Sequence, residues 1–99
     1  MTIEEYNIKV SQYLVKLTEA HVAKGSTFEV IKGKRFDKVV ENMNNGQKMA
    51  HCFIEKSNGD LLKTASWAAP AKGKRGSIFD ERPPLKLGHF YRNGHITSS

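Results

Sequence analysis

The sequence predicts an α+β domain in which an N-terminal amphipathic helix packs on a four- to five-stranded antiparallel meander. Three observations support this prediction: an apolar stripe of helical period near the N-terminus, a change to strand-rich segments after Gly25, and two Asn-Gly pairs between those segments. The 99 residues suffice for one modest hydrophobic core. We therefore expect a single domain over residues 1–99.

The helix is predicted over about residues 3–23. Thr2 and Glu5 form a capping-box pattern, whose two side chains accept hydrogen bonds from backbone amides at the helix start. The apolar residues that recur at helical spacing are Tyr6, Val10, Tyr13, Leu14 and Leu17. The stripe is widened at intervals of seven by Ile8, Val15 and Val22. Gly25 is expected to end the helix, because glycine takes the left-handed conformation without strain.

The meander is predicted over about residues 27–67. Its strands are the segments "TFEVI", "RFDKVV", "MAHCFIE" and "LLKTASW", separated by a turn at Gly33 and by the two Asn-Gly turns. Strict alternation would divide the third strand into a face with Met49, His51 and Phe53 and a face with Ala50, Cys52 and Ile54. Because both faces are partly apolar, this strand is expected to be central, with the helix covering one side.

The remaining third is predicted as a basic loop over 68–77 and a C-terminal extension over 78–99. Pro83 and Pro84 interrupt any helix in the extension, which leaves room for a last strand or short hairpin. The sheet face opposite the helix also needs cover, either from this extension or from a second subunit. The second option predicts a homo-oligomer.

The composition favours an intracellular protein with acidic partners. The formal net charge is +6, which attracts anions over a distance. The one cysteine, Cys52, excludes an internal disulfide and fits a reducing compartment. The start "MTIEEYNIKV" lacks the apolar region of a signal peptide, and no apolar run is long enough to cross a bilayer, so no membrane partner is expected.

The candidate binding site is the stretch "SWAAPAKGKRGSIFD". No acid lies between Leu61 and Phe79, and glycines beside lysines let a backbone approach a phosphate. The residues predicted to bind a polyanion are Lys72, Lys74 and Arg75, with Lys63, Lys34 and Arg35 adding contacts and Trp67 supporting the loop. Two alternatives stay open: Trp67 as a core anchor, and the loop as a solvated connector between strands.

The sequence favours no catalytic, metal or cofactor site. The pattern of a P-loop is absent, and the four histidines lack the paired spacing of zinc ligands. Alternation turns Cys52 away from its neighbour His51, into an apolar setting that makes a poor nucleophile. We therefore expect a protein that is not an enzyme.

The segments "GKRFDKVV", "HCFIEKSNGDLLK" and "KTASWAAPAKGKRGSIF" resemble a family of small tailed-bacteriophage proteins, over roughly residues 28–80. The resemblance implies phage origin and a place in the host bacterial cytoplasm, and it implies no activity. Three function hypotheses follow. The first is a phage protein that binds nucleic acid. The second is a protein that sequesters a small nucleotide signal of host defence, and the third is an inhibitor of an acidic host protein surface.

Overall fold

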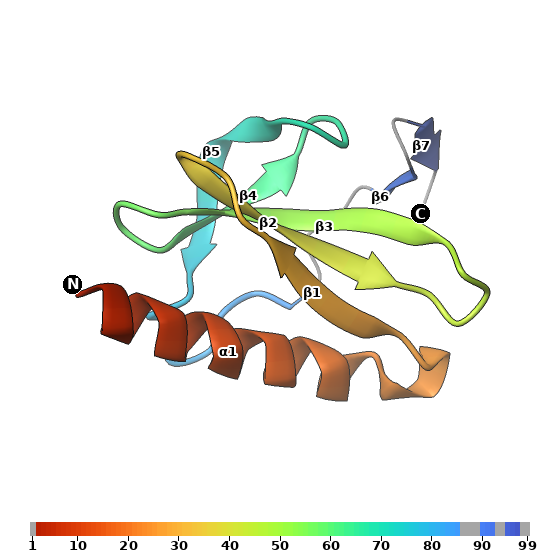
Figure 1. The fold of residues 1–99 in the computed structure, drawn as a ribbon, viewed down its shortest axis with the longest axis horizontal. Helices are drawn as coiled ribbons and strands as arrows, with labels where there is room; N and C mark the ends of the chain where they lie inside the picture. The colour runs from red at the N-terminus through yellow and green to blue at the C-terminus, as the bar shows by residue number, and fades with distance from the viewer. Residues whose placement is uncertain (1, 86–89, 93–94, 98–99) are drawn as a thin grey trace.

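The computed structural model describes residues 2–85, 90–92 and 95–97 and has one helix lying across one face of an antiparallel sheet (Figure 1). The elements are α1 (Ile3–Ala20), the 3-10 turn η1 (Val22–Lys24), β1 (Thr27–Ile31), β2 (Phe36–Asn42), β3 (Lys48–Glu55), β4 (Asp60–Thr64), β5 (Pro70–Ser77), β6 (Phe90–Arg92) and β7 (His95–Thr97). Strands β1 to β5 pair in sequence order, each antiparallel to the next. The predicted α+β meander is confirmed.

Helix α1 begins as the sequence predicts and ends earlier. The Glu5 amide donates to Thr2 Oγ1 and the Thr2 amide donates to Glu5 Oε1, both at 3.1 Å. The helix stops at Ala20, where His21 turns inward and its Nδ1 hydrogen bonds with the Leu17 carbonyl oxygen at 2.8 Å. The chain then tightens into η1 and leaves it through Gly25, which has a φ of +69°. No helix in the described ranges combines the length and apolar character that crossing a bilayer requires.

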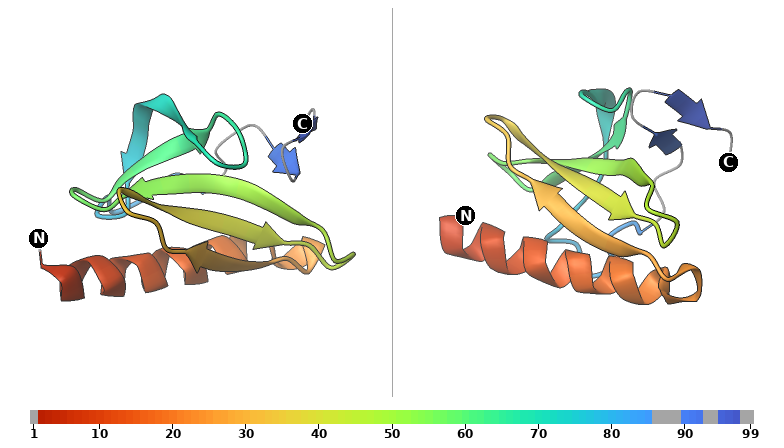
Figure 2. Two further views of the ribbon diagram at one scale, coloured as in Figure 1. Left: turned by 45° about the horizontal axis from the view of Figure 1, so that its top comes forward. Right: turned by 45° about the vertical axis from the view of Figure 1, so that its right-hand side comes forward.

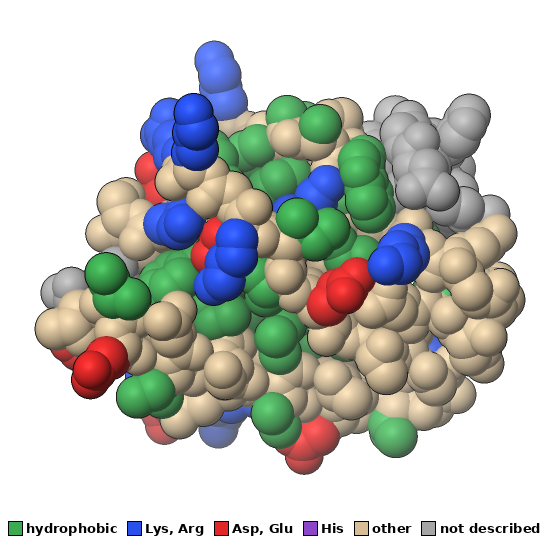
Figure 3. Space-filling model, in the orientation of Figure 1, with side chains coloured by type: hydrophobic (Ala, Val, Ile, Leu, Met, Phe, Trp, Pro, Cys, Tyr) green, Lys and Arg blue, Asp and Glu red, His purple; other side chains and the backbone are tan. Residues whose placement is uncertain are grey.

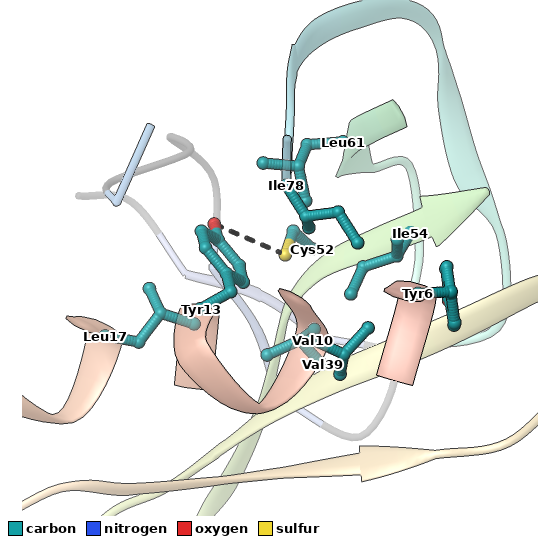
Figure 4. Close-up of a cluster of buried hydrophobic side chains, with 9 residues drawn as sticks. All are labelled: Tyr6, Val10, Tyr13, Leu17, Val39, Cys52, Ile54, Leu61 and Ile78. Carbon is teal, nitrogen blue, oxygen red and sulfur yellow. Dashed lines mark hydrogen bonds between the residues drawn. The ribbon is translucent and has the colours of Figure 1, made fainter. Parts of the chain in front are cut away.

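The core lies between α1 and the sheet (Figure 4). Its buried members are Tyr6, Val10, Tyr13, Leu17, Val39, Cys52, Ile54, Leu61 and Ile78. The expected widening of the stripe is wrong, because Ile8, Val15 and Val22 are all more than half exposed. A helix turns about 100° per residue, so Ile8 is rotated by about 200° around the helix axis from Tyr6. Ile8 therefore lies on nearly the opposite side of the helix and faces solvent.

Alternation along β2 defines the two faces of the sheet. Asp37 and Val39 point toward α1, whereas Phe36 and Lys38 point to the opposite side, which we call the distal face. Phe53 of β3 pairs with Lys38 and belongs to the distal face as well. Figure 2 shows α1 on one side of the sheet and the β4–β5 hairpin curling away on the other.

A bulge in β3 breaks the alternation expected from the sequence. The register between β2 and β3 shifts between Val39 and Val40, which leaves His51 as an extra residue. The His51 ring therefore turns to the helix side, where its centroid lies 5.7 Å from that of His21. The prediction that His51 and Phe53 share one face is wrong for this reason.

The basic loop predicted over 68–77 is for the most part a strand. Residues 70–77 form β5, whose Lys74 pairs with Leu62 and whose Pro70 pairs with Thr64. Proline and glycine weaken a central strand but are tolerated at the edge of a sheet, where β5 lies. The true connector is 65–69, closed by a hydrogen bond of 2.9 Å from the Ala65 amide to the Ala69 carbonyl.

The C-terminal segment crosses the core and returns to β3. The Tyr13 hydroxyl donates to the Pro84 carbonyl oxygen at 2.6 Å, and Gly76 allows the close approach of the Pro84 ring. A Cβ at Gly76 would lie 2.6 Å from that ring. Strands β6 and β7 form the short hairpin anticipated for this segment, and Tyr91 pairs with Ala50 of β3.

A buried carboxylate joins three parts of the fold. Asp37 is fully buried and accepts hydrogen bonds from the Tyr6 hydroxyl at 2.8 Å and from the Gly33 amide at 3.2 Å. The Nζ atoms of Lys32 and Lys56 lie 3.6 and 3.8 Å from its oxygens. The helix, the β1–β2 turn and the β3–β4 turn thus meet at one charge.

A second polar cluster lies beneath the end of α1. Glu41 is fully buried and accepts a hydrogen bond of 2.6 Å from Ser26 Oγ. Burial lowers the pKa of His51 to about 4, and the nearby His21 and Lys24 act in the same direction. Glu41 and a hydrogen bond with the Leu85 backbone raise this pKa but do not offset the effect of burial. The His51 ring is therefore neutral in the folded protein at pH 7.

Replacing Tyr6 by Phe is expected to lower the free energy of unfolding by about 1.5–3 kcal/mol, because a buried carboxylate loses its donor. Tyr13→Phe is the matched control, since Tyr13 is also a buried helix tyrosine but donates to a neutral carbonyl. We expect a smaller loss there, about 0.5–1.5 kcal/mol. Urea denaturation of both variants measures the difference. An equal or larger loss in Tyr13→Phe would contradict the role given to Asp37.

Acid is expected to destabilise the fold through His51. Its pKa is about 4 in the folded chain and 6.5 when unfolded, so the unfolded chain binds more protons between these values. The free energy of unfolding should therefore fall by about 2 kcal/mol between pH 7 and pH 5. In His51→Gln this part of the pH dependence should disappear. A variant that loses as much stability as the parent over that interval would refute the assignment.

Candidate functional site

The distal face is hollowed by a groove where β5 faces the β1–β2 turn and the adjoining ends of β3 and β4. The groove has a volume of about 440 Å³. Its charged or aromatic lining residues are Arg35, Phe36, Glu55, Asp60, Lys72 and Lys74. Figure 3 shows Lys and Arg side chains gathered over this end of the molecule, with carboxylates between them and apolar side chains beside them. Segments that lie far apart in the sequence therefore meet around one hollow.

Two of the three cations predicted in the basic loop, which forms β5 in the structure, line the groove. Lys72 and Lys74 are exposed on either side of Gly73, which has a φ of +98° and no atom near the position of a Cβ. Arg75 is the extra residue where the β4–β5 register shifts between Leu61 and Leu62. It is exposed but does not belong to the groove lining.

The β1–β2 turn contributes the third cation of the groove. Arg35 lines it directly, and Lys34 is exposed beside Arg35 without belonging to the lining. The turn is held by the Asp37 contacts and by a hydrogen bond of 3.0 Å from the Lys56 amide to the Arg35 carbonyl oxygen. The sequence predicts that Arg35 adds contacts to a ligand bound by the basic loop. The structure brings Arg35 and β5 to the same groove.

Lys63 and Trp67 lie outside the groove. Lys63 is on the same side of β4 as Leu61, which packs in the core, so alternation turns it away from the distal face. Trp67 is half-buried in the 65–69 connector rather than a core anchor. Lys38 Nζ lies 4.0 Å from the centroid of its ring and donates to its carbonyl oxygen at 2.9 Å. Burial lowers the pKa of Lys38.

Two carboxylates that sequence reasoning missed balance part of the positive charge. Arg35 Nη2 lies 3.1 Å from Glu55 Oε2, and Lys74 Nζ lies 3.2 Å from Asp60 Oδ1. Lys72 has no ion pair within the described ranges. The signal for these acids was present, because "EKSNGD" places both beside an Asn-Gly turn that brings two strand ends together. The groove therefore carries a modest net positive charge.

Cys52 is poorly suited to act as a nucleophile, and the described residues hold no cluster that could bind a metal ion. Burial raises the pKa of the Cys52 thiol to about 12, although a hydrogen bond with Tyr13 lowers it slightly, so the sulfur is a core atom. No group of three His, Cys, Asp or Glu residues with metal-binding geometry occurs in the part of the chain that is described, and His89 lies outside it. What the groove provides is charge beside an aromatic floor.

Comparison with known proteins places the chain in a family. No curated protein and no solved structure shows significant similarity to it. A family model described as a family of unknown function (DUF7717) matches residues 1–86, which span the helix, the five-stranded meander and all the groove residues. The chain therefore belongs to the DUF7717 family of unknown function.

Proposed function

We propose that this protein binds nucleic acid along the groove of its distal face. The observation that supports the proposal is that Arg35 of the β1–β2 turn and Lys72 and Lys74 of β5 line one hollow with an aromatic floor. Phosphates would contact Lys72 and, at the β1–β2 turn, Lys34, while the bases would lie within the groove. No chemistry on the ligand is required, so the protein acts as a binding module.

The charge balance of the groove suits a ligand that is held by several weak contacts. Lys72 is free of ion pairs among the described residues, whereas Arg35 and Lys74 already contact carboxylates. A polyanion would compete with these carboxylates and release counterions, which makes binding strongly dependent on salt. The net charge of +6 would draw the polyanion toward the protein over a longer distance.

The resemblance to tailed-phage proteins supports a setting for this activity. A phage-encoded nucleic-acid binder would act in the cytoplasm of an infected bacterium. The homo-oligomer stays a prediction, and the distal face on which it was based is the same face that would hold the ligand.

Charge variants around the groove should change affinity in opposite directions. Lys72→Ala is expected to weaken binding of a fluorescent 20-mer about fivefold and to reduce the salt slope by about one. Asp60→Asn should strengthen binding, because it removes the carboxylate that pairs with Lys74. Fluorescence anisotropy at two salt concentrations measures both effects.

The matched control for this experiment is Lys16→Ala. Lys16 is also exposed but lies on α1, on the other side of the sheet. It should leave affinity and salt slope within error of the parent. Equal losses in Lys16→Ala and Lys72→Ala would show attraction by net charge alone, and no binding at low salt would end the proposal.

The size of the groove favours a second candidate, a small nucleotide. A hollow of about 440 Å³ is within the range of pockets that hold small ligands. A protein that sequesters such a ligand should gain several degrees of melting temperature from one mono-, di- or cyclic nucleotide, because only the folded state binds it. That result, together with no binding of the 20-mer, would replace the first proposal.

A further inference from the structure

Three side chains form a column that rises from the distal face of the sheet to the rim of the groove. At its base Phe53 is 4% exposed and packs edge-to-face on Phe36, with ring centroids 6.4 Å apart and planes at 82°. Arg35 lies above Phe36, with its Cζ 4.9 Å from the ring centroid. The column therefore ends in a guanidinium that lies over the half-buried ring of Phe36, which itself packs on the buried ring of Phe53.

Glu55 holds the guanidinium from its edge. Both Nε and Nη2 of Arg35 donate to Glu55 Oε2, at 3.2 and 3.1 Å. Glu55 is the cross-strand partner of Phe36, so the carboxylate and the ring approach Arg35 from adjacent positions on two strands. The Arg35 side chain is nevertheless 74% exposed. The guanidinium lies over the ring and two of its nitrogens contact the carboxylate, which leaves its outer side to solvent.

Resting on the proposed nucleic-acid binding, we infer that Arg35 is the platform on which an unpaired base stacks, and that the ligand is single-stranded nucleic acid. A guanidinium is planar and stacks on bases as well as on aromatic rings. Bases in a duplex are already stacked on one another, so only a single strand can offer a base face to this platform. Lys72, which also lines the groove, would contact the adjoining phosphate.

The aromatic rings themselves are less accessible for this purpose. One face of Phe36 is covered by Arg35, and Lys38 lies 4.0 Å from the centroid of Trp67. A base that stacked directly on either ring from that side would have to displace a cation. The exposed outer face of Arg35 needs no such displacement, and its geometry is already formed before the ligand arrives, which reduces the entropy lost on binding.

The test compares one fluorescent 20-mer as single-stranded DNA, as RNA and as a DNA duplex, with the parent protein and two variants. Arg35→Lys keeps the positive charge but removes the planar group on which a base would stack. We therefore expect about a tenfold loss of single-strand affinity with an unchanged salt slope and little change for the duplex. Circular dichroism and thermal melting show that each variant is folded.

Glu55→Gln separates positioning from charge. If Glu55 only offset the positive charge of the groove, its loss would strengthen the binding of both single strand and duplex, as expected for Asp60→Asn. If it holds the platform, the single strand should gain nothing or lose affinity while the duplex gains. Equal binding of single strand and duplex, or no effect of Arg35→Lys, would overturn the inference but leave nucleic-acid binding intact. Failure of all three probes to bind the parent protein would overturn both.

Discussion

The arrangement of this small domain depends on the buried carboxylate of Asp37. It receives the hydroxyl of Tyr6 from the helix and the amide of Gly33 from the β1–β2 turn. Two lysines from two different turns lie within 4 Å of it. A charge taken out of water is tolerated only when it is paired and hydrogen bonded, so these contacts must all form together. These contacts fix the β1–β2 turn, and this turn positions Arg35 at the groove.

Two of the cations in the groove are paired with carboxylates of the same protein. Glu55 and Asp60 occupy Arg35 and Lys74, so the net charge of the site is far smaller than the count of lysines and arginines suggests. Partial neutralisation weakens non-specific attraction to duplexes, which depends on the number of phosphates contacted. It also leaves the geometry of the guanidinium ordered, because Arg35 is held by a ring and a carboxylate at once. Under our proposal, charge supplies the attraction and stacking on Arg35 selects single strands.

Local sequence signals predicted the parts of the fold that are determined locally. The Thr2–Glu5 capping box and the Asn-Gly turns all appear where the sequence places them, because each depends on neighbouring residues only. The bulge at His51 and the strand formed by "PAKGKRGS" depend on pairing with other strands, against local propensity. The site follows the same rule. Its lysines and Arg35 could be named from the sequence, but their carboxylate partners and the column beneath Arg35 arise from contacts across strands.

Nuclear magnetic resonance tests the central claim most directly, by mapping amide shifts of labelled protein as an unlabelled single-stranded 20-mer is added at low salt. The account predicts progressive shifts at Phe36, Gly73 and their strand neighbours, with the exposed face of α1 around Val15 unchanged. Shifts confined to α1, or spread evenly over every exposed lysine, would contradict a binding groove on the distal face.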